Sequence, residues 1–353
     1  MDRKTYQAVG PAFQAGRRRQ PERLALQVIL VFVALAGAAQ AQTAIKLATI
    51  VPEGSIWDKN VKQMGEEWKT ATDGRVTVTV FNGSSQGDEP QILRKMRVDA
   101  LQAAAFTAVG LGSIDASFNL FDIPFFFESY DELNYVTDKL TPEIRKRVEA
   151  KGFVLLNWGG GGWAQVFTKK PVQTVDDLKS VKLYTSAGND RMVQWFKANG
   201  FQPRAMAMTD IMTGLTTGMI DGMPSPPLGA LMFQWYRQTP YMLDLGLAPI
   251  IGANVITAKA WKAIADADKP KLLAAADGVE KRLRVEVPKL DTNSVAMMTK
   301  NGLTVTKATG PEWKTQLDSL ARTMRGEMVP PDIFDLAVKA RDEFRKKNAA
   351  AKK

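Results

Sequence analysis

Ser225 is the side chain whose sequence context most clearly singles out a functional role. It is flanked by Pro224 and Pro226, which fix the backbone φ angle and remove hydrogen-bond donors around it. Just upstream we predict a short helix over Thr209–Thr217, with Thr209 as its N-cap and Gly218 as its left-handed end. The segment therefore predicts a hydroxyl group held on a stiff loop, which suits hydrogen bonding to a ligand.

The residue types behind most hydrolase and zinc chemistry are missing. The chain of 353 residues contains no histidine and no cysteine. This excludes Ser-His-Asp and Cys-His nucleophile pairs and zinc sites built on histidine or cysteine. Isolated acids stand at predicted turns and helix starts, where such residues usually cap backbone amides: Glu53, Asp58, Asp190, Asp210 and Asp221. We therefore predict a protein that is not an enzyme and that uses no metal and no cofactor.

The glycine run Gly159–Gly162 does not indicate a nucleotide site. It lacks the lysine and serine of a P-loop and the spacing of a dinucleotide-binding fingerprint. We expect it to allow close backbone approach and hinge freedom. The sequence also shows no concentrated basic motif, so we predict no nucleic-acid partner.

Aromatic and hydroxyl side chains near strand ends are the remaining candidates for ligand binding, because loops on rigid scaffolds often carry function. Trp57 and Trp163 are expected in such loops. The tryptophans at helical spacing, Trp68, Trp195, Trp261 and Trp313, are assigned to packing instead. The predicted ligand-binding residues are Glu53, Trp57, Thr107, Trp158, Trp163, Tyr184, Ser186, Ser225, Pro226 and Trp235.

The elements that position these residues alternate between strands and helices. Apolar alternation from Ile45 to Thr49, helical spacing from Ile56 to Trp68 and a second strand over Val76–Val80 form a βαβ unit. Further strands are predicted over 101–106, 153–158, 181–184 and 303–306, with 181–184 starting a second sheet. Residues 261–298 are helical in composition, with Pro270 and Pro288 as interruptions, and a last helix covers about 332–346. The pattern predicts an α/β fold with parallel sheets that bind ligands at their carboxyl edges.

The N-terminus has the features of a secretory signal. Arg17, Arg18, Arg19 and Arg23 precede the apolar run 24–36, and Ala39-Gln40-Ala41 has the form of a cleavage site. We expect residues 1–41 to be a signal peptide that exports the chain to the periplasm. The formal net charge of the chain is +10. The C-terminal residues 347–353 are predicted to form a frayed, solvated basic tail.

Several separated motifs carry a family resemblance. The run 174–184, the helix that follows it and Gly218-Met219-Ile220-Asp221-Gly222 resemble the solute receptors of tripartite ATP-independent periplasmic (TRAP) transporters. Phe121-Asp122-Ile123-Pro124-Phe125-Phe126-Phe127 resembles another motif of that family, and Gly74-Arg75-Val76-Thr77-Val78 its second strand. The resemblance extends over nearly the whole chain after about residue 43.

The resemblance implies a two-domain solute-binding fold with a ligand cleft between the domains and a long helix spanning both. Domain I would cover 43–166, with about 255–300 crossing back to it, and domain II would cover 167–254 with about 301–346. It also implies a small organic solute as ligand and TRAP membrane permease subunits as partners.

Three positions depart from the family's usual pattern. Tyr184 stands where most relatives carry an arginine that binds the substrate carboxylate, Trp163 stands at or next to a second such arginine, and Pro224-Ser225-Pro226 replaces Glu-Asn-Pro. A phenol offers one donor and an aromatic face, whereas a guanidinium offers a fork of donors and a permanent charge. We therefore expect an aromatic or hydrophobic carboxylate, or a neutral compound. Arg191, Arg204 and Arg237 are candidates for a replacement cation.

Two alternatives to a transport receptor remain open from the sequence. One is a secreted enzyme of similar fold that uses Glu53 or Asp221 as general base and Tyr184 as acid. The other is a sensory receptor that pairs with a membrane kinase.

Overall fold

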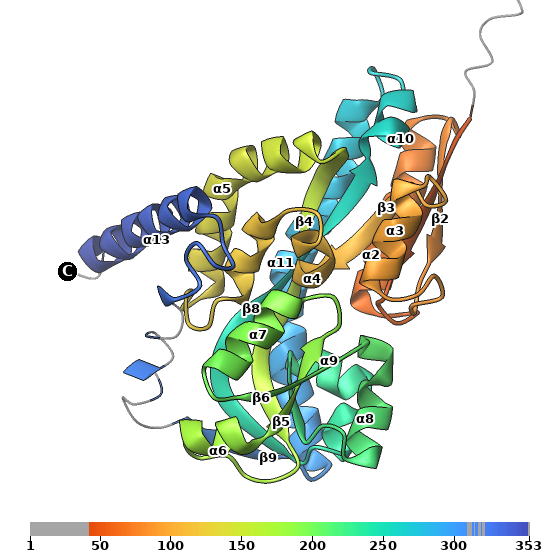
Figure 1. Ribbon diagram of the computed structural model, residues 1–353. Helices are drawn as coiled ribbons and strands as arrows, with labels where there is room; N and C mark the ends of the chain where they lie inside the picture. The colour runs from red at the N-terminus through yellow and green to blue at the C-terminus, as the bar shows by residue number, and fades with distance from the viewer. Residues whose placement is uncertain (1–41, 309–312, 314, 317–318, 320–321, 352–353) are drawn as a thin grey trace, which may run out of the picture. The chain divides into compact units, whose positions relative to one another are not determined.

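The computed structural model describes residues 42–308, 313, 315, 316, 319 and 322–351. Their strands and helices alternate along most of the chain (Figure 1). In order the elements are β1 (Thr43–Thr49), α2 (Ile56–Ala71), β2 (Val76–Phe81), α3 (Glu89–Arg97), β3 (Ala103–Thr107), α4 (Ala108–Gly112), η1 (Ala116–Asp122), α5 (Tyr130–Ala150), β4 (Phe153–Thr168), α6 (Val175–Ser180), β5 (Lys182–Ser186), α7 (Asp190–Ala198), β6 (Gln202–Met206), η2 (Met208–Asp210), α8 (Ile211–Thr217), β7 (Gly222–Ser225), α9 (Pro227–Met232), η3 (Trp235–Arg237), β8 (Tyr241–Thr257), α10 (Ala258–Ala263), α11 (Lys269–Lys300), β9 (Thr304–Lys307) and α13 (Pro331–Ala351).

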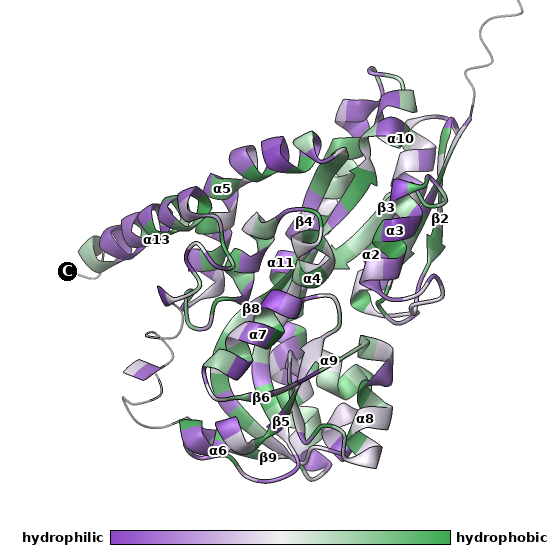
Figure 2. Ribbon diagram, viewed as in Figure 1, coloured by the Kyte–Doolittle hydropathy of each residue, from purple (hydrophilic) through white to green (hydrophobic). Residues whose placement is uncertain are grey.

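The predicted N-terminal βαβ unit is confirmed. β1 pairs in parallel with β2 on one side and with β3 on the other, so that Leu47 lies opposite Val80 and Ala103. Ser55 caps helix α2, because its hydroxyl accepts a hydrogen bond from the Asp58 backbone N–H. Its apolar face packs with the strands into one hydrophobic cluster. Figure 2 shows hydrophobic residues concentrated along these strands and hydrophilic ones along much of α5 and α13.

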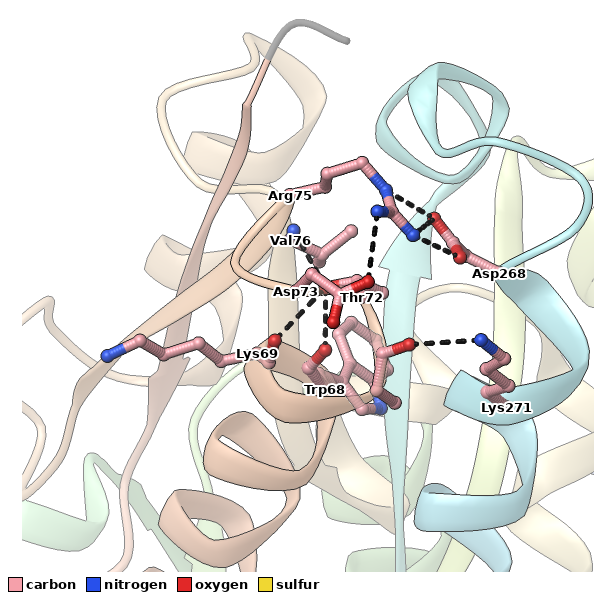
Figure 3. A network of polar contacts seen from close by, with 9 residues as sticks. Trp68, Lys69, Thr72, Asp73, Arg75, Val76, Asp268 and Lys271 are labelled. Atoms are coloured by element: carbon pink, nitrogen blue, oxygen red, sulfur yellow. Dashed lines mark hydrogen bonds and ion pairs between the residues drawn. The ribbon is translucent and has the colours of Figure 1, made fainter. Parts of the chain in front are cut away.

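A polar network fixes the far end of α2 against the start of α11 (Figure 3). The Arg75 guanidinium donates to both carboxylate oxygens of Asp268, at 2.8 and 3.1 Å from Nη2. Thr72 donates to the Trp68 carbonyl at 2.7 Å and accepts from the Val76 N–H at 3.0 Å. The Arg75–Asp268 pair therefore ties the turn between α2 and β2 to a helix nearly two hundred residues later in the chain.

The strands form one continuous sheet, although we expected a separate second sheet to start near residue 181. The order is β2-β1-β3-β8-β4-β7-β5-β6, and β9 pairs with β8. Strands β4 and β8 are long, at 16 and 17 residues, and are hydrogen-bonded antiparallel from Phe153↔Thr257 to Thr168↔Tyr241. They therefore run from the half of the sheet that contains β1 to β3 into the half that contains β5 to β7 (Figure 1).

Helix α11 is the predicted long helix. It has 32 residues and contacts α2, β4 and α9, so it packs against both halves of the sheet. Pro270 lies in its first turn, where a missing N–H costs nothing. Pro288 does not interrupt the helix as we expected, because α11 continues through it to Lys300. Among the described helices, none is both long and apolar enough to cross a membrane.

The last helix is longer than predicted. α13 continues to Ala351 through most of the expected basic tail. It packs on α5, where the Arg345 guanidinium donates to both oxygens of Glu132 at 2.8 and 2.9 Å. Lys347 lies 5.3 Å from the centre of the Tyr135 ring. The signal peptide predicted over 1–41 lies outside the described residues, and the domain boundaries remain a prediction.

The glycine run lies inside β4, not in a loop at its end. The ladder with β8 is interrupted by bulges between Leu155 and Asn157, between Gly160 and Gly162, and between Ala164 and Val166. Gly162 has a φ of +104°, and a Cβ there would come within 2.3 Å of an Asp291 carboxylate oxygen. The Trp163 N–H donates to that same oxygen at 3.0 Å. Gly162 is therefore required where α11 approaches the bulged strand.

Replacing Gly162 by alanine should lower the free energy of unfolding by about 1–3 kcal/mol, because the substitution adds both backbone strain and a clash. Gly160→Ala is the matched control, since a Cβ at Gly160 meets no atom within 4 Å. Urea unfolding followed by circular dichroism measures both. Equal stability of the two variants would contradict the steric role of Gly162.

Candidate functional site

A cavity of about 170 Å³ lies against the middle of β4 and β8, and we call it the apolar chamber. Its floor includes the glycine backbone of β4 and the facing segment 250–254 of β8. Its side-chain walls are mainly aliphatic and aromatic: Ile50, Val51, Pro52, Trp57, Val61, Phe106, Met208, Pro226, Phe233, Trp235, Ile250, Ile251, Val279 and Leu283. No charged side chain of the described residues lines it.

Two indole rings come to this chamber from different halves of the sheet. Trp57 lies in the first turn of α2, and its Nε1 donates to the Gly160 carbonyl at 2.8 Å. Trp235 begins η3 and stacks on Phe233 at a centroid distance of 4.5 Å and an interplanar angle of 12°. Both rings thus have fixed orientations, one through a hydrogen bond and the other through stacking.

A second cavity, of about 260 Å³, adjoins the first, and we call it the acidic chamber. The two share wall residues from both halves of the sheet, namely Ile50, Thr107, Met208, Ser225, Pro226, Trp235, Ile250 and Ile251. The polar and charged side chains of the acidic chamber come from α3, η1, β5 and their connections: Asp88, Glu89, Asp122, Tyr184, Thr185, Ser186 and Asn189. The two chambers together therefore form one site with an apolar and a polar part.

Glu89 is a buried carboxyl held by the start of α4. One carboxylate oxygen accepts from the Thr107 N–H at 2.6 Å, and the other accepts from the Thr107 hydroxyl at 2.7 Å and the Gly110 N–H at 2.9 Å. Burial nevertheless raises the pKa of Glu89 from 4.5 to about 7, because the hydrogen bonds compensate only part of the lost hydration. Glu89 thus occupies the position at which a helix N-terminus would otherwise favour an anion.

Asp122 ends η1 and also lines the acidic chamber. Within the described part of the chain its carboxylate has no hydrogen-bond partner. Burial, and next the neighbouring Glu89 carboxyl, raise the pKa of Asp122 from 3.8 to about 7. An unpaired carboxyl group beside a second carboxyl is electrostatically unfavourable. Both carboxyl groups line the acidic chamber.

Tyr184 and Ser186 face the same chamber from β5. The two hydroxyl oxygens are 3.1 Å apart and share a hydrogen bond. Burial raises the pKa of Tyr184 above its ordinary value, and the carboxyls of Asp88 and Glu89 raise it further. Tyr184 therefore remains a neutral phenol and supplies a donor without a charge.

The structure brings most of the predicted binding residues together. The residues that line the chambers are Trp57, Thr107, Tyr184, Ser186, Ser225, Pro226 and Trp235. Ser225 is not on a loop, however, because it is the last residue of β7 and pairs with Gln165 of β4. Its hydroxyl donates to the Pro226 carbonyl at 3.0 Å, so it faces the ligand space with its proton already engaged. That any of these residues contacts a ligand remains a prediction.

Glu53, Trp158 and Trp163, the other predicted binding residues, line neither chamber. Glu53 is exposed and pairs with Lys62 at 3.3 Å. Trp158 is 4% exposed and donates from Nε1 to the Thr141 hydroxyl at 2.9 Å, next to a separate cavity of about 30 Å³.

Trp163 lies within β4 instead of in a loop, and its ring packs edge-on against Tyr130 at a centroid distance of 5.3 Å. Strand β4 is longer than the sequence pattern predicted. Trp163, which we expected in a loop after the strand, therefore lies inside it and packs against a neighbouring side chain.

The capping prediction for the helix before Ser225 is half right. Gly218 ends α8 in the left-handed conformation, with a φ of 74°. Thr209 is not its N-cap, because a 3-10 turn over Met208–Asp210 precedes the helix, and Asp210 occupies the cap position without a side-chain hydrogen bond.

No basic side chain replaces the family's arginine in the described walls of either chamber. Arg191, Arg204 and Arg237, the predicted candidates, are all exposed. Sequence reasoning missed Glu89, Asp122 and Phe233. Asp122 lies in the quoted motif at 121–127, so its position was visible although its role was not. Nothing in the spacing of Glu89 or Phe233 distinguishes them from ordinary helix and packing residues.

The fold and the chambers define a two-domain α/β binding protein with a ligand cleft. A family model for bacterial extracellular solute-binding proteins, family 7, matches residues 47–327. A solute-binding protein of Chromohalobacter salexigens is 27% identical over 236 residues, which are 66% of this chain and 68% of the relative. The chain belongs to this family, whose members include the solute receptors of TRAP transporters.

Solved structures share the fold. A TRAP periplasmic solute binding protein of Chromohalobacter salexigens with bound D-glucuronate has a TM-score of 0.78 at 21% identity, covering 84% of this chain and 99% of that one. A TRAP receptor of Desulfovibrio salexigens with bound orotic acid has a TM-score of 0.80 at 14% identity, covering 86% and 99%. These family members and neighbours are binding proteins.

The raised carboxyl pKa values predict how stability depends on pH. Glu89 and Asp122 shift to about 7 and Asp291 to about 6, all above their ordinary values. Between the ordinary and the raised pKa the folded chain binds more protons than the unfolded chain, so the free energy of unfolding should fall as pH rises from about 4.5 to 7. Asp122→Asn removes one of these groups and should flatten the decline.

Urea unfolding across this pH range measures the effect. Asp210→Asn is the matched control, because Asp210 is exposed and outside both chambers. An identical pH slope for wild type and Asp122→Asn would contradict the raised pKa of Asp122.

Proposed function

We propose that the protein is the periplasmic solute receptor of a TRAP transport system, exported by its N-terminal segment. It binds a small organic acid with an apolar or aromatic body and delivers it to the membrane permease subunits. The observation that carries this proposal is the apolar chamber between Trp57 and Trp235, on a fold whose family binds extracellular solutes. Ligand sites typically combine such apolar walls with a few polar groups that fix orientation.

The chamber walls favour an apolar body over a sugar acid. A glucuronate hydroxyl that enters a cavity without a hydrogen-bond partner loses its hydration and gains little, at a cost of about 1–3 kcal/mol. Most polar side chains of the apolar-chamber walls are already engaged: Trp57 Nε1 and the Ser225 hydroxyl with backbone carbonyls, the Thr107 hydroxyl with Glu89, and the Asn254 amide with Asn157. A planar ring of the kind that orotic acid presents would instead gain from the two indole faces.

The walls come from both halves of the sheet, so a ligand would hold the halves together. Trp57 and Phe106 belong to the first half, and Phe233 and Trp235 follow β7 in the second. Binding favours closure only if the ligand contacts more surface in the closed state than in the open one. A ligand bridging the two indoles meets this condition.

The enzymatic alternative lacks its catalytic arrangement. Neither Glu53 nor Asp221 lines the chamber that contains Tyr184. Asp221 instead lies 3.9 Å from Lys169 and 3.8 Å from Lys182 in half-exposed ion pairs. A general base has to be within hydrogen-bond reach of the proton that it removes, so these residues do not form an acid–base pair.

A thermal-shift screen tests the ligand class. Aromatic and hydrophobic organic acids should raise the melting temperature, whereas succinate and glucuronate should not. A ligand at 100 times its Kd adds about 2.7 kcal/mol of stability, which such a screen detects. A shift with sugar acids and none with apolar-bodied acids would refute the proposal.

Trp57→Leu should weaken binding of a screened ligand about tenfold. The substitution removes an aromatic face, worth about 0.5–1.5 kcal/mol, and the hydrogen bond that holds the wall at Gly160. Trp163→Leu is the matched control, because Trp163 lines neither chamber and its Nε1 has no partner in the described structure. Calorimetric titration measures both variants. Equal losses of affinity would place the ligand elsewhere.

A further inference from the structure

The charged side chains in the described walls of the two chambers are all acidic. Asp88, Glu89 and Asp122 line the acidic chamber, and none of the described lysines or arginines lines either chamber. When these carboxyls are ionised, the site therefore has a negative potential, and its described walls contain no counter-charge. An organic acid that relied on the protein to neutralise its carboxylate would find no cation here.

The acidic groups differ in how far the protein satisfies them. Glu89 accepts three hydrogen bonds from the start of α4, and Asp88 caps α3 by accepting from the Glu89 N–H at 3.0 Å. The Asp122 carboxylate has no partner among the described residues. Asp122 is thus the acceptor that the fold leaves available inside the chamber.

One buried hydroxyl beside the acidic chamber also lacks a partner. Thr185 of β5 is only 6% exposed and lines the acidic chamber, yet its hydroxyl has no hydrogen-bond partner. Buried hydroxyls in folded proteins nearly always have one, because an unpaired polar group costs about 1–3 kcal/mol. The Thr185 hydroxyl oxygen is itself inaccessible from the chamber, so a polar ligand group would reach it only if the side chain changed rotamer. The described acids do not converge as a metal site.

Electrostatics decides which polar group fits. A second or third negative charge beside Asp122 and Glu89 would be repelled, and in a poorly hydrated cavity this repulsion is stronger than in water. An ammonium group is attracted to the same position and offers up to three donors to carboxylate oxygens. A ligand that carries both groups brings its own counter-charge, so the receptor needs no arginine.

We propose that the acidic chamber binds an ammonium group, with Asp122 as its acceptor, and that the ligand is an amino or imino acid whose apolar body fills the adjoining chamber. This inference rests on the proposed function and narrows its ligand class. The Tyr184 and Ser186 hydroxyls, which share one hydrogen bond on the β5 side, supply a neutral donor for the ligand's oxygens. The ammonium group of the ligand then supplies the positive charge that an arginine supplies in most relatives.

Matched compounds separate the two charges of such a ligand. Phenylalanine, 3-phenylpropionate and phenethylamine form one set, and leucine, 4-methylpentanoate and isopentylamine form another. In calorimetric titrations at pH 8, where carboxyls with a pKa of about 7 are mostly ionised, the amino acid of at least one set should bind at least tenfold more tightly than its deamino acid.

The other outcomes are distinguishable. If the deamino acids bind as tightly or more tightly, this inference is overturned while the proposed function stands. If only the amines bind, the ammonium site is supported but the organic-acid function fails. If no compound with an apolar body binds, whereas succinate or glucuronate does, both proposals fail.

Asp122→Asn tests the residue that we assign. It removes the charge at nearly constant size and should weaken amino-acid binding about tenfold, while binding of the deamino acid stays the same or strengthens. Asp210→Asn, in the exposed turn before α8, should change neither. Equal weakening of both compounds by Asp122→Asn would show a merely structural role. The melting temperature of each variant reports whether it is folded, and the wild-type titrations test the inference without any substitution.

Discussion

The antiparallel ladder between β4 and β8 is the constraint on which the rest of the structure depends. These strands are paired along almost their whole length, and they connect the two halves of the sheet without a break. Both chambers take walls from them, the apolar one at Gly159–Gly161 and the acidic one at Ala164 and Val166. Any closure about a ligand therefore has to be absorbed by these strands. The bulges in the ladder are the places where a paired strand bends at least cost.

Asp291 links that bulged region to the long helix. Its carboxylate accepts from the Trp163 N–H on β4 and from the Leu228 N–H at the start of α9, at 3.0 and 2.9 Å. Burial raises the pKa of Asp291 to about 6, which the two backbone donors partly offset. One side chain of α11 thus holds a strand and a helix start beside the site. Only a glycine at 162 allows it to come so close.

The division of the site into two chambers gives a physical basis for selectivity. Apolar walls stabilise a bound ring or branched aliphatic group and disfavour a ligand hydroxyl that finds no hydrogen-bond partner. The neighbouring carboxyl groups attract a positively charged group of the ligand and repel a negatively charged one. A site can reject a solute by leaving its polar groups unpaired, as well as by binding its intended ligand more tightly. In the proposed function, a TRAP receptor that lacks the usual guanidinium would in this way bind an organic acid while rejecting simple dicarboxylates.

The sequence by itself determined the class of protein. Local signals such as the βαβ pattern from Ile45 to Val80, the left-handed Gly218 and the separated family motifs depend on neighbouring residues, so they could be recognised without coordinates. The absence of histidine and cysteine excluded whole classes of chemistry in the same direct way. The departure at Tyr184 was equally visible, since it needed only one position within a motif.

The tertiary structure decided which residues share a cavity and with what charge. Trp163 and Trp158 were expected at strand ends, but β4 extends through both and turns them to packing roles. Glu89, Asp122 and Thr185 come from different elements, and nothing in their local sequence indicates that they line one chamber. Burial, pairing and the resulting pKa values depend on distances between residues far apart in the chain, and those distances exist only once the sheet has formed.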